Sequence, residues 1–420
     1  MSMKISIIGA GSSYTPELFE RLAQMRSQLP VTDITLMDID SYRLGAVKAF
    51  CERFARHLGM DVRIGSTTDL DEAVSGSTFV NTQIRVGGNA CRVNDEKIPL
   101  SMGLLGQETT GAGGFMKALR TIPAMLKIAD SIEKNAPDAW MINYTNPTGI
   151  VSQAIHDNTQ IKCAALCYGG VRAADRAAAA LGVDAKDVQY DIFGLNHCNF
   201  AYNFRVRGRA LTEEELYKVA ENVSEVAVDL TSRLKAVPSG YTQYYYHRQK
   251  KVEALFAQNK TRGETVLELE KEIYADFLNS SFDQKPPSLK KRGGGGYAAV
   301  ALSVMDAIYN NRDTWHVINV PNNGVFRFLP DSAVMETAVL VNANGLKPIT
   351  VSMPPPKAVW GLVSMVKNYE MLTAEAAVTG DRDTAVLALT HHPLICDYDL
   401  ASELFGKMLE ANRAYLPQFK

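Results

Sequence analysis

A short apolar run that ends in a glycine turn and continues into a helix constrains this fold more than any other feature. The run KISIIGA at residues 4–10 leads through Gly11 into PELFERLAQM, where Pro16 marks the first turn of a helix. Glycines allow a tight turn and let backbone N–H groups approach a pyrophosphate at the helix N-terminus. This context predicts the start of a dinucleotide-binding unit.

A carboxylate follows the next predicted strand. In DITLMDI, Asp38 stands at the strand end, where it can accept hydrogen bonds from a ribose diol. A carboxylate there favours NAD, since it would repel the 2′-phosphate of NADP. Gly9 and Gly11 are present, but Tyr14 occupies the place of the usual third glycine. An ordinary glycine turn with a strand-end aspartate remains the alternative.

Apolar runs and amphipathic runs alternate from residue 4 to about residue 200, which is typical of a parallel sheet covered on both faces. Further strands are expected in STFVNTQIRV, AWMINYT and IKCAALC. Beyond residue 200 the pattern loosens into antiparallel strands and long helices. We predict an α/β fold, with a Rossmann-like doubly wound sheet in residues 1–200 and a mixed α+β domain in residues 201–420.

Composition narrows the class of protein. The 420 residues carry a net charge of −2 and no long basic stretch, which argues against a nucleic-acid partner or a membrane surface. No apolar run reaches the roughly 18 residues of a membrane span, and the N-terminus lacks the layout of a secretory signal. The six scattered cysteines favour reduced thiols. We therefore expect a cytoplasmic protein.

A cysteine and a histidine follow two further predicted strands. Cys167 ends ALC and His197 ends FGLNH, so both are expected at the carboxyl edge of the sheet, where open α/β folds bind ligands. A thiolate and an imidazole with open positions would suit Mn²⁺, Fe²⁺, Co²⁺ or Zn²⁺. A buried cysteine and a satisfied histidine without metal are the alternative.

Polar loops at other strand ends indicate a pocket. TQIRVGGNA contains Arg85 and Asn89, GQETTGAGG contains Glu108, and INYTNPTG contains Asn146. A cluster of tyrosines lies in PSGYTQYYYHR, where Tyr241 and Tyr245 would share one helix face at i and i+4. A tyrosine near positive charge can act as a base, although packing is the simpler role.

Together these stretches resemble glycoside hydrolase family 4, the NAD- and metal-dependent glycosidases. The resemblance extends along nearly the whole chain and includes IGAGSSYTPEL, QIRVGG, GQETTGAGG, NYTNPTG, FGLNH, PSGY, KRGG and ALTHHPL. GSSYTPEL, GQET and FGLNH look most like the 6-phospho-β-glucosidase branch. The family differs from two-carboxylate glycosidases because it depends on NAD.

The resemblance implies a lactate/malate dehydrogenase-like fold and a redox-assisted elimination. NAD⁺ would take a hydride from C3 of the sugar, a base would remove the acidified C2 proton, and the glycosidic oxygen would leave from C1. Water would then add and the hydride would return. The metal, expected to be Mn²⁺, would polarise the C3 carbonyl. A phosphorylated sugar is the expected partner, and a homodimer or homotetramer the expected assembly.

The resemblance also assigns roles by position. Cys167 and His197 would be the metal ligands, and Tyr241 the base, with Tyr245 as second choice. The cofactor side would comprise Gly9, Gly11, Ser12, Ser13 and Asp38. The substrate contacts would be Arg85, Asn89, Asn146, Tyr168 and Arg292.

One position departs from the branch. Asparagine usually follows the metal cysteine in the 6-phospho-β-glucosidases, whereas Tyr168 stands here. This residue would lie near the sugar, so a 6-phospho-α-glucoside, a galactoside or a uronide stays open as the substrate. The rival functions are a 2-hydroxy-acid dehydrogenase, which would need no metal, and a sensor that binds NAD or a sugar phosphate without turnover.

Overall fold

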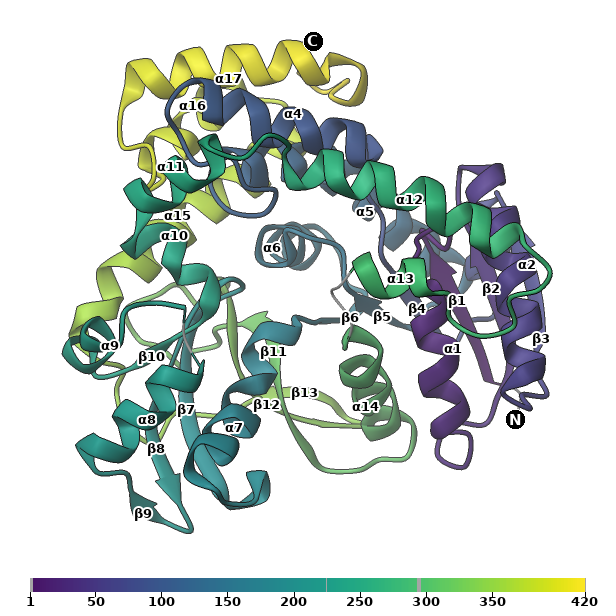
Figure 1. Ribbon diagram of the computed structural model, residues 1–420, viewed down its shortest axis with the longest axis horizontal. Helices are drawn as coiled ribbons and strands as arrows, with labels where there is room; N and C mark the ends of the chain where they lie inside the picture. Colours follow the sequence, from purple (N-terminus) through teal and green to yellow (C-terminus); the bar gives the residue numbers. More distant parts are fainter. Residues whose placement is uncertain (1–2, 224, 293–295, 420) are drawn as a thin grey trace.

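The computed structural model describes residues 3–223, 225–292 and 296–419, with the side chains of residues 168–172 and of residue 223 outside the described set. A large sheet crosses the molecule, and helices lie on both of its faces (Figure 1). A smaller antiparallel sheet lies beside it and carries the neighbouring helices.

The large sheet has nine strands within the described residues, and six of them are parallel. In spatial order the parallel strands are β3 (Arg63–Thr67), β2 (Val31–Met37), β1 (Met3–Ile8), β4 (Phe79–Thr82), β5 (Trp140–Asn143) and β6 (Lys162–Ala165). The order 3-2-1-4-5-6 is that of a dinucleotide-binding fold. The predicted Rossmann-like sheet is confirmed.

The second half of the chain extends this sheet beyond β6. Antiparallel strands follow there in the order β11 (Thr314–Pro321), β12 (Val334–Asn342) and β13 (Gly345–Pro348). They cover the edge that β6 would otherwise leave unpaired. This contribution could not be predicted from the sequence, because antiparallel strands that join a sheet from a distant segment have no local signature. The division at residue 200 stays a prediction.

The helices of the first half connect the parallel strands, except for the last of them, which leads from β6 to the smaller sheet. They are α1 (Thr15–Gln24), α2 (Ser41–His57), α3 (Leu70–Val74), α4 (Gly88–Ser101), α5 (Ala112–Asn135), α6 (Thr148–Asn158) and α7 (Tyr168–Leu181). Parallel strands need such crossovers, and strands buried on both faces read as apolar runs. All four residues of β4 are buried accordingly.

The smaller sheet consists of β7 (Val188–Leu195), β8 (Cys198–Val206), β9 (Arg209–Ala210) and β10 (Val237–Pro238). Strands β7 and β8 form a hairpin joined by two residues, Asn196 and His197. The antiparallel strands expected after residue 200 are thus confirmed. His197 was expected at the end of a strand of the parallel sheet. That expectation is wrong, because His197 lies in the turn of this separate hairpin.

The second half is rich in helices, as its sequence indicates. They are α8 (Glu213–Val223), α9 (Val228–Leu234), α10 (Gln243–Tyr246), α11 (Arg248–Phe256), α12 (Arg262–Leu278), α13 (Pro287–Arg292), α14 (Tyr297–Tyr309), α15 (Lys357–Thr379), α16 (Arg382–His391) and α17 (Tyr398–Asn412). Single turns of 3-10 helix occur at Ala185–Asp187, Gly240–Thr242 and Arg413–Tyr415. Among the helices that the structure describes, none combines the length and apolar character that crossing a bilayer requires.

Candidate functional site

The carboxyl ends of four neighbouring parallel strands bring most of the candidate residues to one edge of the sheet. In the spatial order β1, β4, β5 and β6, these ends lead to Gly9, Arg85, Asn146 and Cys167. Strands lie about 4.8 Å apart, so three steps separate Gly9 from Cys167 by roughly 14 Å. Open α/β folds bind ligands at this edge.

The glycine turn after β1 is shaped for close approach. Gly9 has φ +84, and a Cβ on it would lie 2.9 Å from the backbone C and O of Gln83. A Cβ on Gly11 would lie 2.8 Å from Oδ2 of Asp38. Gly9 is therefore required for reasons of both conformation and space, and Gly11 for reasons of space.

Asp38 is held against this turn. Its Oδ2 accepts a hydrogen bond from the Gly11 N–H at 2.8 Å, and its Oδ1 accepts one from the Asp40 N–H at 3.0 Å. Burial outweighs these two donors and raises the pKa of Asp38 above its usual range. Ser13 adds a buried Oγ without a hydrogen-bond partner among the described residues, whereas the Oγ of Ser12 accepts from the Tyr14 N–H at 3.3 Å. The turn, the carboxylate and the free hydroxyl fit a dinucleotide.

Cys167 and His197 line one cavity of about 150 Å³, although they come from different sheets. Cys167 follows β6 directly, and His197 adopts φ 63 in the hairpin turn between β7 and β8. Asn199 and Tyr241 line the same cavity. The structure thus brings the predicted metal pair together, but by packing one sheet against the other.

The chemistry of this pair fits a divalent metal. The Nδ1 of His197 is buried and has no hydrogen-bond partner among the described residues. Burial, reinforced by the charge of Lys117, lowers the pKa of His197 to about 3, so the imidazole is neutral, as metal ligation requires. No cluster of three or more His, Cys, Asp and Glu side chains suited to a metal occurs in the described residues. A metal here would keep open positions for a substrate.

Tyr241 lies directly against the histidine. The two rings stack with centroids 3.7 Å apart and planes 2° from parallel. Burial, and then the neighbouring Cys167 and Glu108, raise the pKa of Tyr241. A tyrosine removes a proton only as a phenolate, so a base at this position needs added positive charge nearby. A metal at the Cys–His pair would provide it.

Tyr245 points elsewhere. Its ring lies 6.1 Å from the ring of His392, centroid to centroid. The expectation that Tyr241 and Tyr245 share a helix face is wrong, because Tyr241 belongs to the 3-10 turn Gly240–Thr242 and α10 begins only at Gln243. The geometry favours Tyr241 over Tyr245 as the residue that faces the cavity.

Arg85 belongs to a cationic cluster centred on one carboxylate. Glu108 forms ion pairs with Arg85, with Nη1 of Arg92 at 3.1 Å and with Nζ of Lys117 at 3.1 Å. Burial alone would raise the pKa of Glu108, but the three cations hold that pKa well below its usual range. Burial and the charge of Arg85 lower the pKa of Lys117 to about 8. Three cations around one carboxylate favour an anionic ligand, although Glu96 also pairs with Arg92 at 2.8 Å.

The remaining substrate candidates differ in their surroundings. Asn89, at the start of α4, is buried, and its Oδ1 has no partner among the described residues. Asn146 bonds within its own turn, where its Oδ1 accepts from Thr148 Oγ1 at 3.3 Å. Arg292 lies over the ring of Tyr14, 3.9 Å from its centroid, and so borders the glycine turn. The side chain of Tyr168 lies outside the described residues.

Several residues near the site were not predicted from the sequence, among them Arg92, Lys117, Asn199 and Glu336. Arg92 and Lys117 lie inside helices, where charged residues are usually solvated. Glu336 did carry a signal, because it is a single carboxylate inside the apolar strand run AVMETAVLV.

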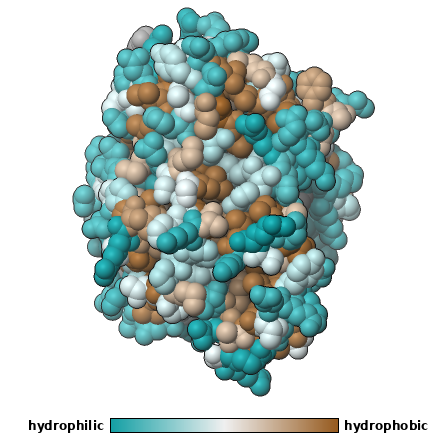
Figure 2. All heavy atoms as spheres, turned by 90° about the vertical axis from the view of Figure 1, so that its left-hand side faces the viewer, coloured by the Kyte–Doolittle hydropathy of each residue, from teal (hydrophilic) through white to brown (hydrophobic). Residues whose placement is uncertain are grey.

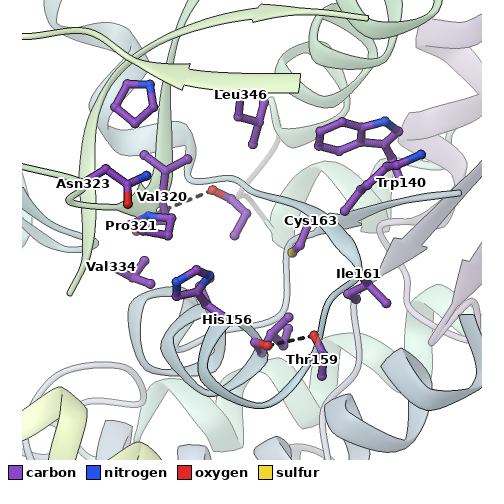
Figure 3. A pocket seen from close by; sticks show the side chains of 16 residues that line it. Trp140, His156, Thr159, Ile161, Cys163, Val320, Pro321, Asn323, Val334 and Leu346 are labelled. Atoms are coloured by element: carbon purple, nitrogen blue, oxygen red, sulfur yellow. Dashed lines mark hydrogen bonds between the residues drawn. The ribbon is translucent and has the colours of Figure 1, made fainter. Parts of the chain in front are cut away.

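A second cavity, of about 240 Å³, lies away from these residues. It is lined by Trp140, the first residue of β5, and by Lys162, Cys163 and Ala165 along β6. Figure 3 shows His156 and Cys163 pointing into it, among apolar side chains. None of the predicted site residues lines this cavity.

Comparison with protein families places two models on the chain. The model "Family 4 glycosyl hydrolase" matches residues 4–183, and "Family 4 glycosyl hydrolase C-terminal domain" matches residues 192–395. A "Probable 6-phospho-beta-glucosidase" of Bacillus subtilis is 37% identical over 433 residues, which cover 99% of this chain and 98% of that protein.

Two solved structures share the fold. The 6-phospho-β-glucosidase from Thermotoga maritima, solved with manganese, NAD+ and glucose-6-phosphate, has a TM-score of 0.90 and 29% identity, covering 98% of this chain and 99% of that one. A 6-phospho-α-glucosidase from gut microorganisms, in complex with NAD and Mn2+, has a TM-score of 0.88 and 26% identity, covering 100% of both chains. The similarity thus extends over the whole fold.

Proposed function

The chain belongs to glycosyl hydrolase family 4, and on this basis we propose that it hydrolyses 6-phospho-β-glucosides with the help of NAD and a divalent metal, expected to be Mn²⁺. The observation that carries the proposal is the meeting of two sites at one sheet edge. A dinucleotide cradle follows β1, and the cavity of Cys167, His197 and Tyr241 begins three strands away at β6. A 2-hydroxy-acid dehydrogenase has no need of the second site.

When bound, NAD supplies a reversible hydride acceptor for C3 of the sugar, and the metal supplies Lewis acidity toward the oxygen at that carbon. The turn at Gly9 and Gly11 carries no side chain that would keep a pyrophosphate from the N-terminus of α1, and Asp38 is placed to accept hydrogen bonds from a ribose. Cys167 and His197 would hold the metal through a thiolate sulfur and a neutral imidazole nitrogen.

Tyr241 is the proposed base for the proton at C2 of the sugar. Loss of this proton, made acidic by oxidation at C3, lets the bond between C1 and the glycosidic oxygen break. Water then adds at C1, a proton returns to C2 and the hydride returns to C3, so the products are those of hydrolysis without net oxidation. General base catalysis of this kind contributes roughly 10²- to 10⁴-fold to a rate.

The substrate phosphate has two candidate binding regions. The cluster of Arg85, Arg92 and Lys117 around Glu108 carries more positive than negative charge close to the cavity. Arg292 offers a second cation beside Tyr14, with a buried Nε that has no partner among the described residues. Both favour a phosphorylated sugar over a neutral one.

The β-anomer is proposed because of the 37% identity to the probable 6-phospho-β-glucosidase of Bacillus subtilis. Activity on a 6-phospho-α-glucoside is the second candidate, favoured by the 26% identity to the gut 6-phospho-α-glucosidase and by Tyr168 at the position after the metal cysteine. A galactoside or a uronide is the third.

We further propose a homodimer or homotetramer. Figure 2, which views the side that carries α9, α11 and α15, shows apolar groups scattered among hydrophilic ones. Exposed apolar side chains include Phe256 of α11, Met365 of α15 and Leu387 of α16. The expected compartment is the cytoplasm, because the thiol of Cys167 must stay reduced to bind a metal.

The test is hydrolysis of p-nitrophenyl 6-phospho-β-D-glucoside, with the α-anomer and the unphosphorylated glucoside as controls. Each reaction is run with and without NAD⁺ and Mn²⁺ in D₂O under reducing conditions. We expect cleavage of the phosphorylated β-anomer that needs both cofactors, with deuterium entering C2. Cleavage of the α-anomer alone would refute the anomeric assignment, and cofactor binding without exchange at C2 would favour the sensor.

A further inference from the structure

Glu336 is a buried carboxylate on which three asparagine side chains converge. It lies in β12 and is 0% exposed. The Nδ2 of Asn199 donates to its Oε2, and the Nδ2 groups of Asn196 and Asn319 each lie 3.5 Å from its Oε1. A buried carboxylate that accepts several amide hydrogen bonds is an arrangement costly to break, because any donor left unpaired loses its hydration without compensation.

Two of these asparagines flank the proposed histidine ligand. Asn196 precedes His197, and Asn199 follows it by two residues. Glu336 therefore accepts hydrogen bonds from the hairpin on both sides of the histidine. His197 has φ 63, a conformation that non-glycine residues adopt rarely and keep only when the surroundings impose it. The contacts from Glu336 are a source of that constraint.

The third asparagine connects Glu336 with the strand of the cysteine. The Nδ2 of Asn319 also donates to the carbonyl oxygen of Ala165 at 3.1 Å, two residues before Cys167. Asn319 and Ala165 are the one residue pair that joins β11 to β6 in the described part of the sheet. The position of Cys167 relative to β12 thus depends on this one asparagine side chain more than on an extended ladder.

The proposed base is connected as well. The backbone carbonyl of Asn199 accepts a hydrogen bond from the Ser239 N–H at 2.9 Å, two residues before Tyr241. Glu336 therefore reaches all three elements of the cavity, the strand of Cys167, the turn of His197 and the loop of Tyr241, while its own side chain is not among the cavity-lining residues.

We propose that Glu336 is a positioning residue that holds the Cys167 strand and the His197 turn at the separation a divalent metal requires. The inference rests on the proposed function in one respect, which is that Cys167 and His197 are the metal ligands. Residues that orient metal ligands without contacting the metal typically contribute roughly 10- to 100-fold to metal affinity.

The test measures Mn²⁺ binding to the purified protein without substrate, from the loss of the electron paramagnetic resonance signal of free Mn²⁺. NAD⁺ binding by calorimetry and the melting temperature are measured on the same samples. The variants are Glu336→Ala, Glu336→Gln and Asn319→Ala. The matched control is Glu370→Gln, which changes another buried carboxylate, one that pairs with Lys367 on its own helix at 2.6 Å.

We expect Glu336→Ala to weaken Mn²⁺ binding roughly 10- to 100-fold. Glu336→Gln keeps one oxygen that can accept from Asn199, but its new amide group would face the Nδ2 donors of Asn196 and Asn319. The loss of Mn²⁺ affinity should therefore be smaller than in Glu336→Ala. Asn319→Ala should also weaken Mn²⁺ binding, because it removes the contact that holds the strand before Cys167. NAD⁺ affinity should stay unchanged in all three, because the cradle follows β1. Glu370→Gln should melt at a lower temperature and bind Mn²⁺ as the unaltered protein does.

Two results in the Glu336 and Asn319 variants would overturn the positioning role, and a third would come from the metal ligands themselves. The first is unchanged Mn²⁺ affinity in folded Glu336→Gln and Asn319→Ala. These two variants keep the test decisive even when Glu336→Ala does not fold. The second is a parallel loss of Mn²⁺ and NAD⁺ binding, which would make Glu336 a general stability residue. A Cys167→Ser, His197→Ala double variant tests the assignment of the metal ligands separately from the positioning role of Glu336. If it binds Mn²⁺ normally, the metal site itself is misassigned, and the role of Glu336 falls with it.

Discussion

Replacing Gly11 with alanine should weaken NAD binding while leaving the fold intact. The added Cβ would lie 2.8 Å from Oδ2 of Asp38 and 2.9 Å from Cβ of Arg43. An ordinary contact between a methyl group and an oxygen needs at least about 3.4 Å, so the carboxylate must move by roughly 0.6 Å. The hydrogen bond from the Gly11 N–H, now 2.8 Å long, would be stretched beyond the usual range of about 2.7–3.2 Å and weakened.

The size of the effect follows from that hydrogen bond. A hydrogen bond to a charged group contributes about 1.5–3 kcal/mol. The displaced carboxylate would have to be moved back for a ribose to bind, so the dissociation constant of NAD should rise roughly 10- to 100-fold. Isothermal titration calorimetry of NAD⁺ against both proteins measures the change directly.

Gly45→Ala is the matched control. Gly45 lies in α2, two residues after Arg43, and a Cβ there would meet nothing within 4 Å. Alanine inside an exposed helix is favoured over glycine by about 0.5–1 kcal/mol, so this variant should be slightly more stable and bind NAD normally. NAD affinity within twofold of the unaltered protein in folded Gly11→Ala would refute the reasoning about Asp38.

Three further predictions concern catalysis, stability and pH. Tyr241→Phe should keep NAD and Mn²⁺ binding but slow deuterium exchange at C2 by at least about 10²-fold, measured by NMR; a rate near normal would exclude Tyr241 as the base. Asp95→Asn should lower the free energy of unfolding by about 3–5 kcal/mol in urea, because it leaves the buried Arg120, now 2.6 Å from Asp95, without its charge partner. Burial raises the pKa of Glu336 from 4.5 to about 7. The native state then binds more protons than the unfolded state between these values, so the free energy of unfolding should fall as the pH rises from 4.5 to 7. Glu336→Gln should lack this fall, and an identical pH profile in both proteins would contradict the assignment.

Residues whose roles depend on their immediate neighbours could be predicted from the sequence. Gly9, Gly11 and Asp38 are tied to the strand-turn-helix pattern, which is set by local backbone geometry and by the pyrophosphate-binding property of a helix N-terminus. The parallel strands were equally readable, because burial on both faces makes them continuous apolar runs. The fold of the first half was therefore predictable in outline.

Residues that act through distant partners could not be placed in this way. Arg85 was expected at a strand end, yet its ion pair with Glu108 and the shared contacts of that carboxylate with Arg92 and Lys117 depend on how α4 and α5 pack. The separate paths of Tyr241 and Tyr245 depend on a 3-10 turn that their spacing does not reveal.

The sequence by itself determined the dinucleotide-binding strand–turn–helix, the alternation of strands and helices in the first half and the residue types available for metal binding. Only the tertiary structure decided that His197 reaches Cys167 from a different sheet, and that Glu336 of β12 connects both of their supports. The physical reason is the sequence separation over which each kind of interaction acts. Local sequence sets torsion angles and the periodicity of burial, whereas a site built from segments about 170 residues apart forms only when apolar packing brings its parts together.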